Sequence, residues 1–162
     1  MMRFYNQNEE KMRNIILGII ILFASVTLAY GQAESPQELA DSYKEFHDKK
    51  DIDQVVALFY SKDAASTNVS TINHVLKFEF EDGDKIEQII INEIDQGELE
   101  KMTNGIPYGD RLLAVPTINK LTHTIKVVLI RDGPYPLETA QEFHMGKTEL
   151  GYLFTMSKLI EP

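Results

Sequence analysis

Residues 35–60 read SPQELADSYKEFHDKKDIDQVVALFY, and this stretch decides the class of fold. Ser35 provides an N-cap, Pro36 suits a first helical turn, and Glu38, three residues after the cap, completes a capping box. Three apolar residues then recur with the spacing of one helix face: Leu39, Tyr43 and Phe46. The pattern predicts an amphipathic helix that ends near the two lysines at 49 and 50.

A second helix is predicted directly after the first. Asp51 can cap it in the same way, and Gln54 follows three residues later. The apolar residues expected on its buried face are Ile52, Val55, Val56, Phe59 and Tyr60. We therefore expect two short antiparallel helices joined by a tight turn.

Residues 64–94 are expected to form a loop followed by a β-hairpin. Residues 64–73 are small and polar and show no clear period, and Asp82-Gly83 is a turn signal. A three-residue turn with Gly83 in the left-handed position would place opposite charges across the strands, in the pairs Glu79–Lys85 and Lys77–Glu87. The isoleucines between residues 86 and 94 also fit helical spacing, but their β-propensity and the preceding Asp-Gly favour a strand.

The remaining sequence is rich in strand signals. Residues 112–130 are strand-like but interrupted by Pro116, and residues 121–127 alternate strictly between apolar and polar side chains. Residues 138–145 and 152–160 are predicted as the last two strands, and residues 98–102 as one helical turn. The fold class predicted is α+β, with two N-terminal helices packed on a curved antiparallel sheet that forms a cone or roll.

Two segments resemble a known family. Residues 58–64, LFYSKDA, are similar to the end of the second helix in the nuclear-transport-factor-2-like (cystatin-like cone) superfamily, and residues 143–154 resemble the final hairpin of its exported members. The resemblance implies a curved sheet wrapped on helices, often with a pocket between them. Many members carry a third helix, for which residues 64–73 are expected to be too short. This fold hosts isomerases, dehydratases and binding modules, so the resemblance implies no single activity.

In enzymes of the resembled superfamily, a carboxylate and one or two tyrosines or histidines line the pocket. The counterparts that this resemblance suggests here are Tyr43, His47, Tyr60, Asp63 and His123. A buried aspartate with a raised pKa could serve as a general base, although Asp63 is also explained as a turn residue after a helix. The sequence contains no nucleophile elbow, phosphate loop or dinucleotide fingerprint, so no catalytic residue is assigned.

No metal or cofactor is predicted. The four histidines, at positions 47, 74, 123 and 144, lack the spacing of metal ligands on one element. The acidic residues at 79, 81, 82 and 84 lack the pattern of an EF-hand loop, and a turn and cross-strand pairing explain them without calcium.

Residues 12–33 have the three parts of a secretory signal. Arg13 is positively charged, residues 15–28 are apolar but shorter than the roughly 20 residues of a membrane span, and small residues follow. Cleavage before Gln32 or before Tyr30 fits this pattern. We therefore predict an N-terminal extension and signal over residues 1–32 and a single exported α+β domain over residues 33–162. With the signal cleaved there is no stable membrane span, and an uncleaved N-terminal anchor is the alternative.

Composition limits the class of partner. The formal net charge of −9 argues against nucleic acid and against an anionic membrane surface. The chain contains no cysteine, which excludes disulfides and a cysteine-linked lipid. The leading hypothesis is a non-enzymatic domain that binds a small apolar ligand or a protein partner in the cell envelope, periplasmic or extracellular. The alternatives are an isomerase or lyase of the ketosteroid-isomerase type and a structural module that forms homodimers through a sheet face.

Overall fold

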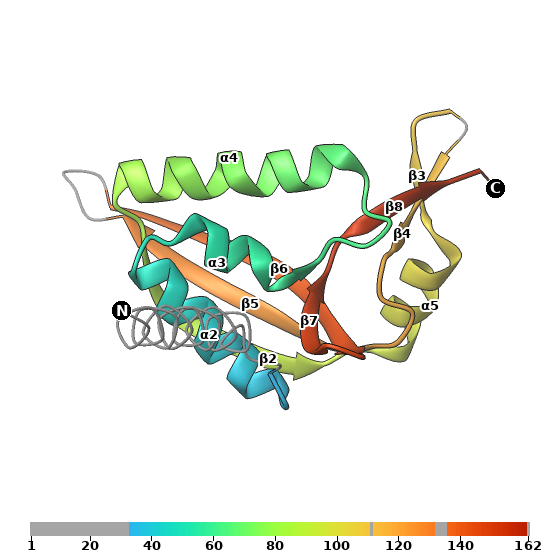
Figure 1. Ribbon diagram of the computed structural model, residues 1–162, viewed down its shortest axis with the longest axis horizontal. Coiled ribbons are helices and arrows are strands. Elements are labelled where there is room, and N and C mark those ends of the chain that lie inside the picture. The colour runs from blue at the N-terminus through green and yellow to red at the C-terminus, as the bar shows by residue number, and fades with distance from the viewer. Residues whose placement is uncertain (1–32, 111, 132–135, 162) are drawn as a thin grey trace, which may run out of the picture. The chain divides into compact units, whose positions relative to one another are not determined.

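A computed structural model describes residues 33–110, 112–131 and 136–161, which contain both helices and strands (Figure 1). In chain order the elements are α2 (Pro36–Asp48), α3 (Ile52–Ala57), β1 (Phe59–Tyr60), α4 (Ser66–Asp82), β2 (Lys85–Glu93), α5 (Gln96–Asn104), β3 (Ile106–Tyr108), β4 (Leu112–Pro116), β5 (Leu121–Arg131), β6 (Leu137–Thr148), β7 (Gly151–Thr155) and β8 (Ser157–Ile160). The α+β class predicted from the sequence is confirmed.

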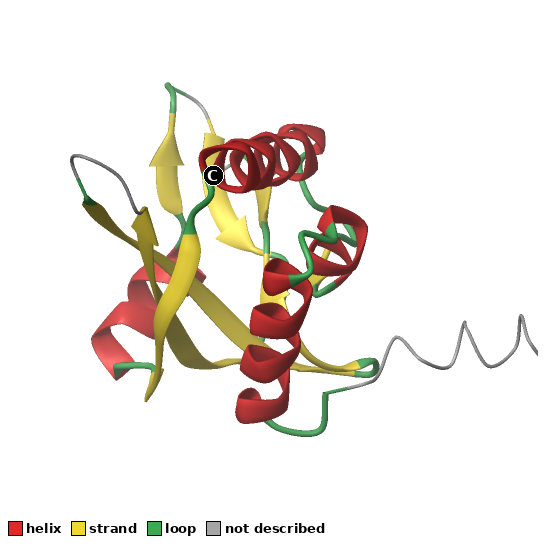
Figure 2. Cartoon of the chain, turned by 90° about the vertical axis from the view of Figure 1, so that its left-hand side faces the viewer, coloured by secondary structure: helices red, strands yellow, loops and turns green. Residues whose placement is uncertain are grey.

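The strands form two sheets. The larger has the order β1-β7-β6-β5-β2 and is antiparallel except for the β1–β7 pair, and the smaller has the order β3-β4-β8. Alternate residues of β5 are fully buried, namely Ile125, Val127 and Leu129, and belong to the same core as residues of α2, α3 and α4. Figure 2 shows these three helices on one side of the curved sheet. The helix α5 lies apart from them, against β4.

The first two helices begin where the sequence predicts. The Ser35 hydroxyl accepts a hydrogen bond from the Glu38 amide, and the Asp51 carboxylate accepts one from the Gln54 amide. The capping box is altered, because the Glu38 carboxylate accepts from the amide of Glu34, 2.7 Å away, and not from that of the cap residue.

The second helix is shorter than predicted. It ends at Ala57, and Phe59 and Tyr60, which we expected on its buried face, form β1 instead. β1 runs parallel to β7 with Phe59 opposite Phe154, and the Phe154 amide donates to the carbonyl of Leu58. Pairing with the C-terminal strand therefore draws the chain out of the helix.

The predicted loop and hairpin over residues 64–94 is wrong in its first half. Residues 66–82 form the single helix α4, so the third helix that we expected to be missing is present. The strand β2 pairs with β5, and residues 77 and 79 lie in α4, so the predicted cross-strand arrangement of these residues with Lys85 and Glu87 is wrong. Gly83 does adopt the left-handed conformation, with φ of +78°, but it ends a helix there. The strand prediction over the isoleucines is confirmed.

The C-terminal strands largely follow the prediction. β4 ends at Pro116, β5 covers the alternating segment, and the predicted last strand divides into β7 and β8, which belong to different sheets. In β6, Gly146 lies so close to a neighbouring segment that a Cβ atom there would be 2.2 Å from the Lys120 carbonyl oxygen. The helix α5 is longer than the single turn expected.

Backbone contacts tie the N-terminal segment to the last strands. The Tyr152 amide donates to the Ala33 carbonyl, and the Ala65 amide donates to the Ser157 carbonyl. The Asn68 side chain donates to the same Ser157 carbonyl. These hydrogen bonds join the chain before α2 to β7 and the start of α4 to β8.

The centre of the core is aromatic. Tyr43, Phe59, Phe143 and Phe154 lie with ring centroids 5.1 to 5.6 Å apart, which is the range of favourable aromatic contact. These four side chains come from α2, β1, β6 and β7. The cluster therefore joins the helices to the sheet.

No helix within the described ranges is long and apolar enough to cross a membrane. The apolar stretch over residues 15–28, on which the predicted secretory signal rests, lies outside those ranges.

Candidate ligand-binding site

A cavity of about 410 Å³ lies between α4 and the sheet. Its volume is within the range of small-molecule sites in proteins. The helix α4 provides one wall, and α2, α3, β1 and β6 provide the others. Most of the lining is apolar, including Val55, Phe59, Ile72, Leu76 and Phe143. The cavity is therefore suited to an apolar molecule.

Tyr43 is the polar group best placed in this cavity. It projects from α2, its side chain is only 1% exposed, and it is one of the lining residues. No residue that the structure describes makes a hydrogen bond with its hydroxyl. Every fully enclosed side-chain nitrogen or oxygen among the described residues has a partner, so this hydroxyl keeps contact with open space. Because Tyr43 lines the cavity, we infer that its hydroxyl faces that space.

The surroundings of Tyr43 keep it protonated. Burial, and secondly the negative charge of Glu79, raise the pKa of Tyr43 well above its ordinary value. At neutral pH the hydroxyl is therefore a hydrogen-bond donor that no group in the described part of the chain accepts from.

Behind Tyr43 lies a buried polar cluster formed by His47, Glu79 and Gln141. His47 Nε2 lies 3.3 Å from Glu79 Oε2, with side-chain exposures of 2% and 6%. The Gln141 side-chain amide donates to Glu79 Oε1, so both carboxylate oxygens are engaged. The His47 ring also stacks on Tyr43 at 6.0 Å and meets the edge of Phe80 at 4.9 Å. The cluster therefore contacts the Tyr43 ring through His47, and its Gln141 also lines the cavity.

The five residues suggested by the resemblance do not meet in one place. Tyr43 and His47 lie together, as described. Tyr60 donates to Glu149 over 3.4 Å and borders a separate surface hollow at the end of β7. Asp63 is an exposed turn residue with φ of +63°, and His123 hydrogen-bonds Thr122 beside the Tyr152 ring.

Sequence reasoning missed Glu79 and Gln141. Glu79 was assigned to a strand and paired with Lys85, so its burial beside His47 could not be anticipated. A signal for the helix was present, because Val69, Ile72, Leu76 and Phe80 repeat at three- and four-residue intervals. On that helix, Glu79 lies three residues after Leu76 and shares its buried face.

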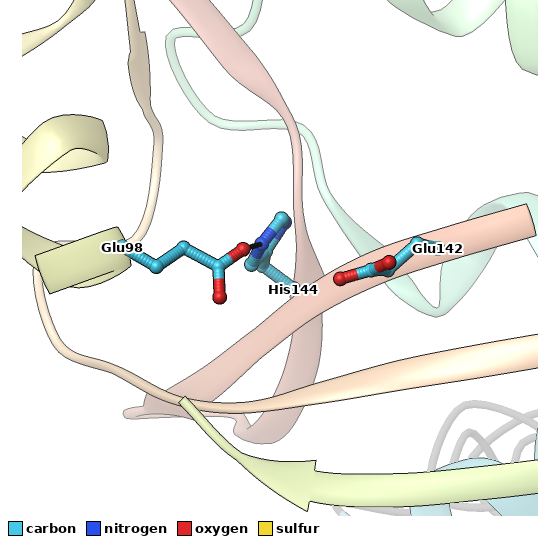
Figure 3. A group of neighbouring side chains, drawn as sticks. All are labelled: Glu98, Glu142 and His144. Carbon is cyan, nitrogen blue, oxygen red and sulfur yellow. Dashed lines mark hydrogen bonds and ion pairs between the residues drawn. The ribbon is translucent and has the colours of Figure 1, made fainter. Parts of the chain in front are cut away.

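A second group of polar side chains lies on the other side of β6. His144 and Glu142 alternate with Gln141 and Phe143 along the strand, so their side chains project from the opposite face of the sheet, and Glu142 also borders the cavity. Glu98 approaches them from α5 (Figure 3). This group contains donor atoms suitable for a metal ion.

No protein-family model matches this chain, and no curated protein matches it. Among solved structures, the chain is similar to a protein described as a "putative polyketide cyclase" from Xanthomonas campestris pv. campestris. The identity is 9%, the match covers 75% of this chain and 87% of the other, and the TM-score is 0.42. At a TM-score below 0.5, the two chains are not shown to share a fold.

Proposed function

We propose that this protein binds a small, largely apolar molecule that carries a hydrogen-bond acceptor, in the cavity between α4 and the sheet. The observation that carries the proposal is the Tyr43 hydroxyl, unpartnered among the described residues, at a cavity of about 410 Å³ whose lining is mostly apolar. A ligand acceptor such as a carbonyl oxygen would give this hydroxyl the hydrogen-bond partner that no described residue supplies.

The geometry favours binding over proton transfer. An isomerase of the ketosteroid type would need a base that reaches the ligand. Glu79 is the nearest buried carboxylate, but both its oxygens are engaged by His47 and Gln141, and it is not among the lining residues. Glu142 does border the cavity, but it is exposed and its side chain alternates along β6 with those of Gln141 and Phe143. Asp63, the other carboxylate considered, is exposed at a turn elsewhere.

The proposal includes two expectations drawn from the sequence. We place the ligand-binding domain outside the cytoplasm, because residues 12–33 have the pattern of a secretory signal. We also propose that the chain belongs to the exported members of the nuclear-transport-factor-2-like superfamily, supported by three helices packed against one side of a curved sheet.

The test uses 6-propionyl-2-dimethylaminonaphthalene, an apolar fluorophore whose single ketone accepts hydrogen bonds. The wavelength and intensity of its emission, measured as the full chain is added, report both its entry into an apolar site and hydrogen bonding to its ketone. Tyr43→Phe removes only the hydroxyl and should weaken binding about fivefold, because a net hydrogen bond contributes about 1 kcal/mol. Ile72→Trp, on the α4 wall, should abolish binding by filling the cavity.

Phe78→Ala is the matched control. Phe78 is also on α4 and is 53% exposed, but it does not line the cavity. This variant should bind the fluorophore as the unchanged protein does. If Ile72→Trp and the unchanged protein bind the fluorophore with equal affinity, the fluorophore binds outside the cavity and the proposal is contradicted. Turnover of a β,γ-unsaturated ketone that Tyr43→Phe abolishes would favour the isomerase instead.

A further inference from the structure

We propose that Glu98, Glu142 and His144 form a binding site for a divalent transition-metal ion, for which Zn²⁺ is the best match. The three side chains lie on the face of β6 opposite to Gln141 and Phe143, and Glu142 is the one residue that this site shares with the lining of the cavity. The site brings together two side chains of β6 and one of α5. The spacing of residues within a single element could not predict such a site.

The donor atoms already converge. His144 Nε2 lies 2.7 Å from Glu98 Oε1. One potential ligand atom from each of the three residues lies within 4.8 Å of the other two. Figure 3 shows the Glu98 and Glu142 carboxylates on either side of the His144 ring. Ligands in a tetrahedral zinc site lie about 2.0–2.2 Å from the metal, so modest side-chain rotations would complete the geometry.

The state of Glu142 is the second observation. No side chain that the structure describes makes an ion pair or hydrogen bond with its carboxylate. Its cross-strand neighbour on β5 is Lys126, an exposed lysine for which the described residues show no ion pair either. An unpaired carboxylate therefore lies beside a histidine that already contacts a second carboxylate. A divalent cation would offset the repulsion between the two carboxylates directly.

The donor set selects the class of metal. Calcium and magnesium prefer oxygen ligands alone, whereas an imidazole nitrogen with carboxylates suits zinc and neighbouring first-row ions. His144 is partly sheltered, with a side-chain exposure of 20%, and Glu98 is 39% exposed. Three protein ligands would leave a coordination position open to water.

Position on rigid elements supports the same assignment. His144 and Glu142 lie two residues apart on β6, so both point to one face of the strand. Glu98 is in the first turn of α5, whose start is fixed by two hydrogen bonds from backbone amides to the Asp95 side chain. Two of the three ligands are thus held by a paired strand and the third by a capped helix.

The test is a calorimetric titration of the full chain with Zn²⁺ at neutral pH, followed by the absorption spectrum with Co²⁺. We expect one ion per chain and visible Co²⁺ bands of four-coordinate intensity. His144→Ala and Glu142→Gln should each weaken Zn²⁺ binding by at least about tenfold, which is the lower end of the loss caused by removing even an outer-shell partner. Glu142 is exposed, so its variant should fold normally.

Two variants serve as matched controls. Glu138→Gln neutralises an exposed glutamate on the same strand, and His74→Ala removes an exposed histidine on α4. Both should keep the Zn²⁺ affinity of the unchanged protein. Absence of stoichiometric binding to the unchanged chain would overturn the proposal. Equal weakening by the controls and by the site variants would also overturn it, since it would indicate only scattered surface binding.

Discussion

Replacing Glu79 by leucine should destabilise the protein strongly. Glu79 is 5% exposed and accepts hydrogen bonds from Gln141 and from His47. Leucine has a similar size but accepts no hydrogen bond. The substitution therefore leaves the buried His47 and the half-buried Gln141 amide without their partner, while the apolar packing around the side chain changes little.

The magnitude follows from those two donors. A buried donor left unsatisfied costs about 1–3 kcal/mol, and breaking a buried histidine–carboxylate pair by removing one partner costs about 3–5 kcal/mol. Burial of the leucine side chain offsets part of this cost. We expect the free energy of unfolding of Glu79→Leu to fall by about 3 kcal/mol.

Urea denaturation followed by circular dichroism measures this change. Glu81→Leu, at an exposed position of the same helix, is the control and should change stability by less than about 0.5 kcal/mol. The double variant His47→Leu/Glu79→Leu should lose less stability than the two single changes added together, because it removes both partners. A loss below about 1 kcal/mol for Glu79→Leu would refute the reasoning, since the pair would then contribute nothing that leucine cannot replace.

Three further predictions use other parts of the chain. Gly146→Ala should lower the free energy of unfolding, measured by urea denaturation, by about 1–3 kcal/mol, because its new Cβ has no room. Gly83→Ala should lower it by about 1 kcal/mol, because only its left-handed backbone is strained. Equal losses in the two variants would contradict the steric explanation for Gly146. Since the folded state holds the Tyr43 proton more tightly than the unfolded state does, stability should fall as pH rises above about 10, the ordinary tyrosine value, and less steeply in Tyr43→Phe. N-terminal sequencing of the protein from a secreting host should find a start at Tyr30 or Gln32, whereas an intact N-terminus in the membrane fraction would favour the anchor.

Local sequence signals were sufficient for the starts of the first two helices and for most strands. The caps at Ser35 and Asp51 act within three residues, and strict alternation in β5 reflects burial of one face, so both can be read without knowing the rest of the fold. β1 could not be anticipated in this way. Its two residues leave a helical pattern only because β7, more than 90 residues later, offers a strand edge.

The error at α4 has a definite cause. A left-handed glycine ends helices as readily as it closes hairpins, so Asp82-Gly83 did not distinguish the two. The charge pairs predicted across the hairpin then appeared to confirm the wrong choice. Because Glu79 was placed on a strand, its partnership with His47 was hidden.

The metal-site residues were hidden for a different reason. Glu98 and His144 are 46 residues apart and meet only because α5 lies next to the face of β6 that points away from the core. The sequence pattern of neither segment predicts this contact. Clusters of this kind depend on the tertiary fold.

The bonds between the N-terminal helical segment and the last strands have a kinetic consequence. Asn68 and Ser157 are 89 residues apart, and the partners Leu58 and Phe154 are of similar separation. Folding slows as contacts join more distant parts of a chain, because the loop between them must be closed first. During synthesis, β1 and the start of α4 have no strand to join until nearly the whole chain has emerged. A chain that acquires its final structure so late would stay unfolded long enough for the export that we propose.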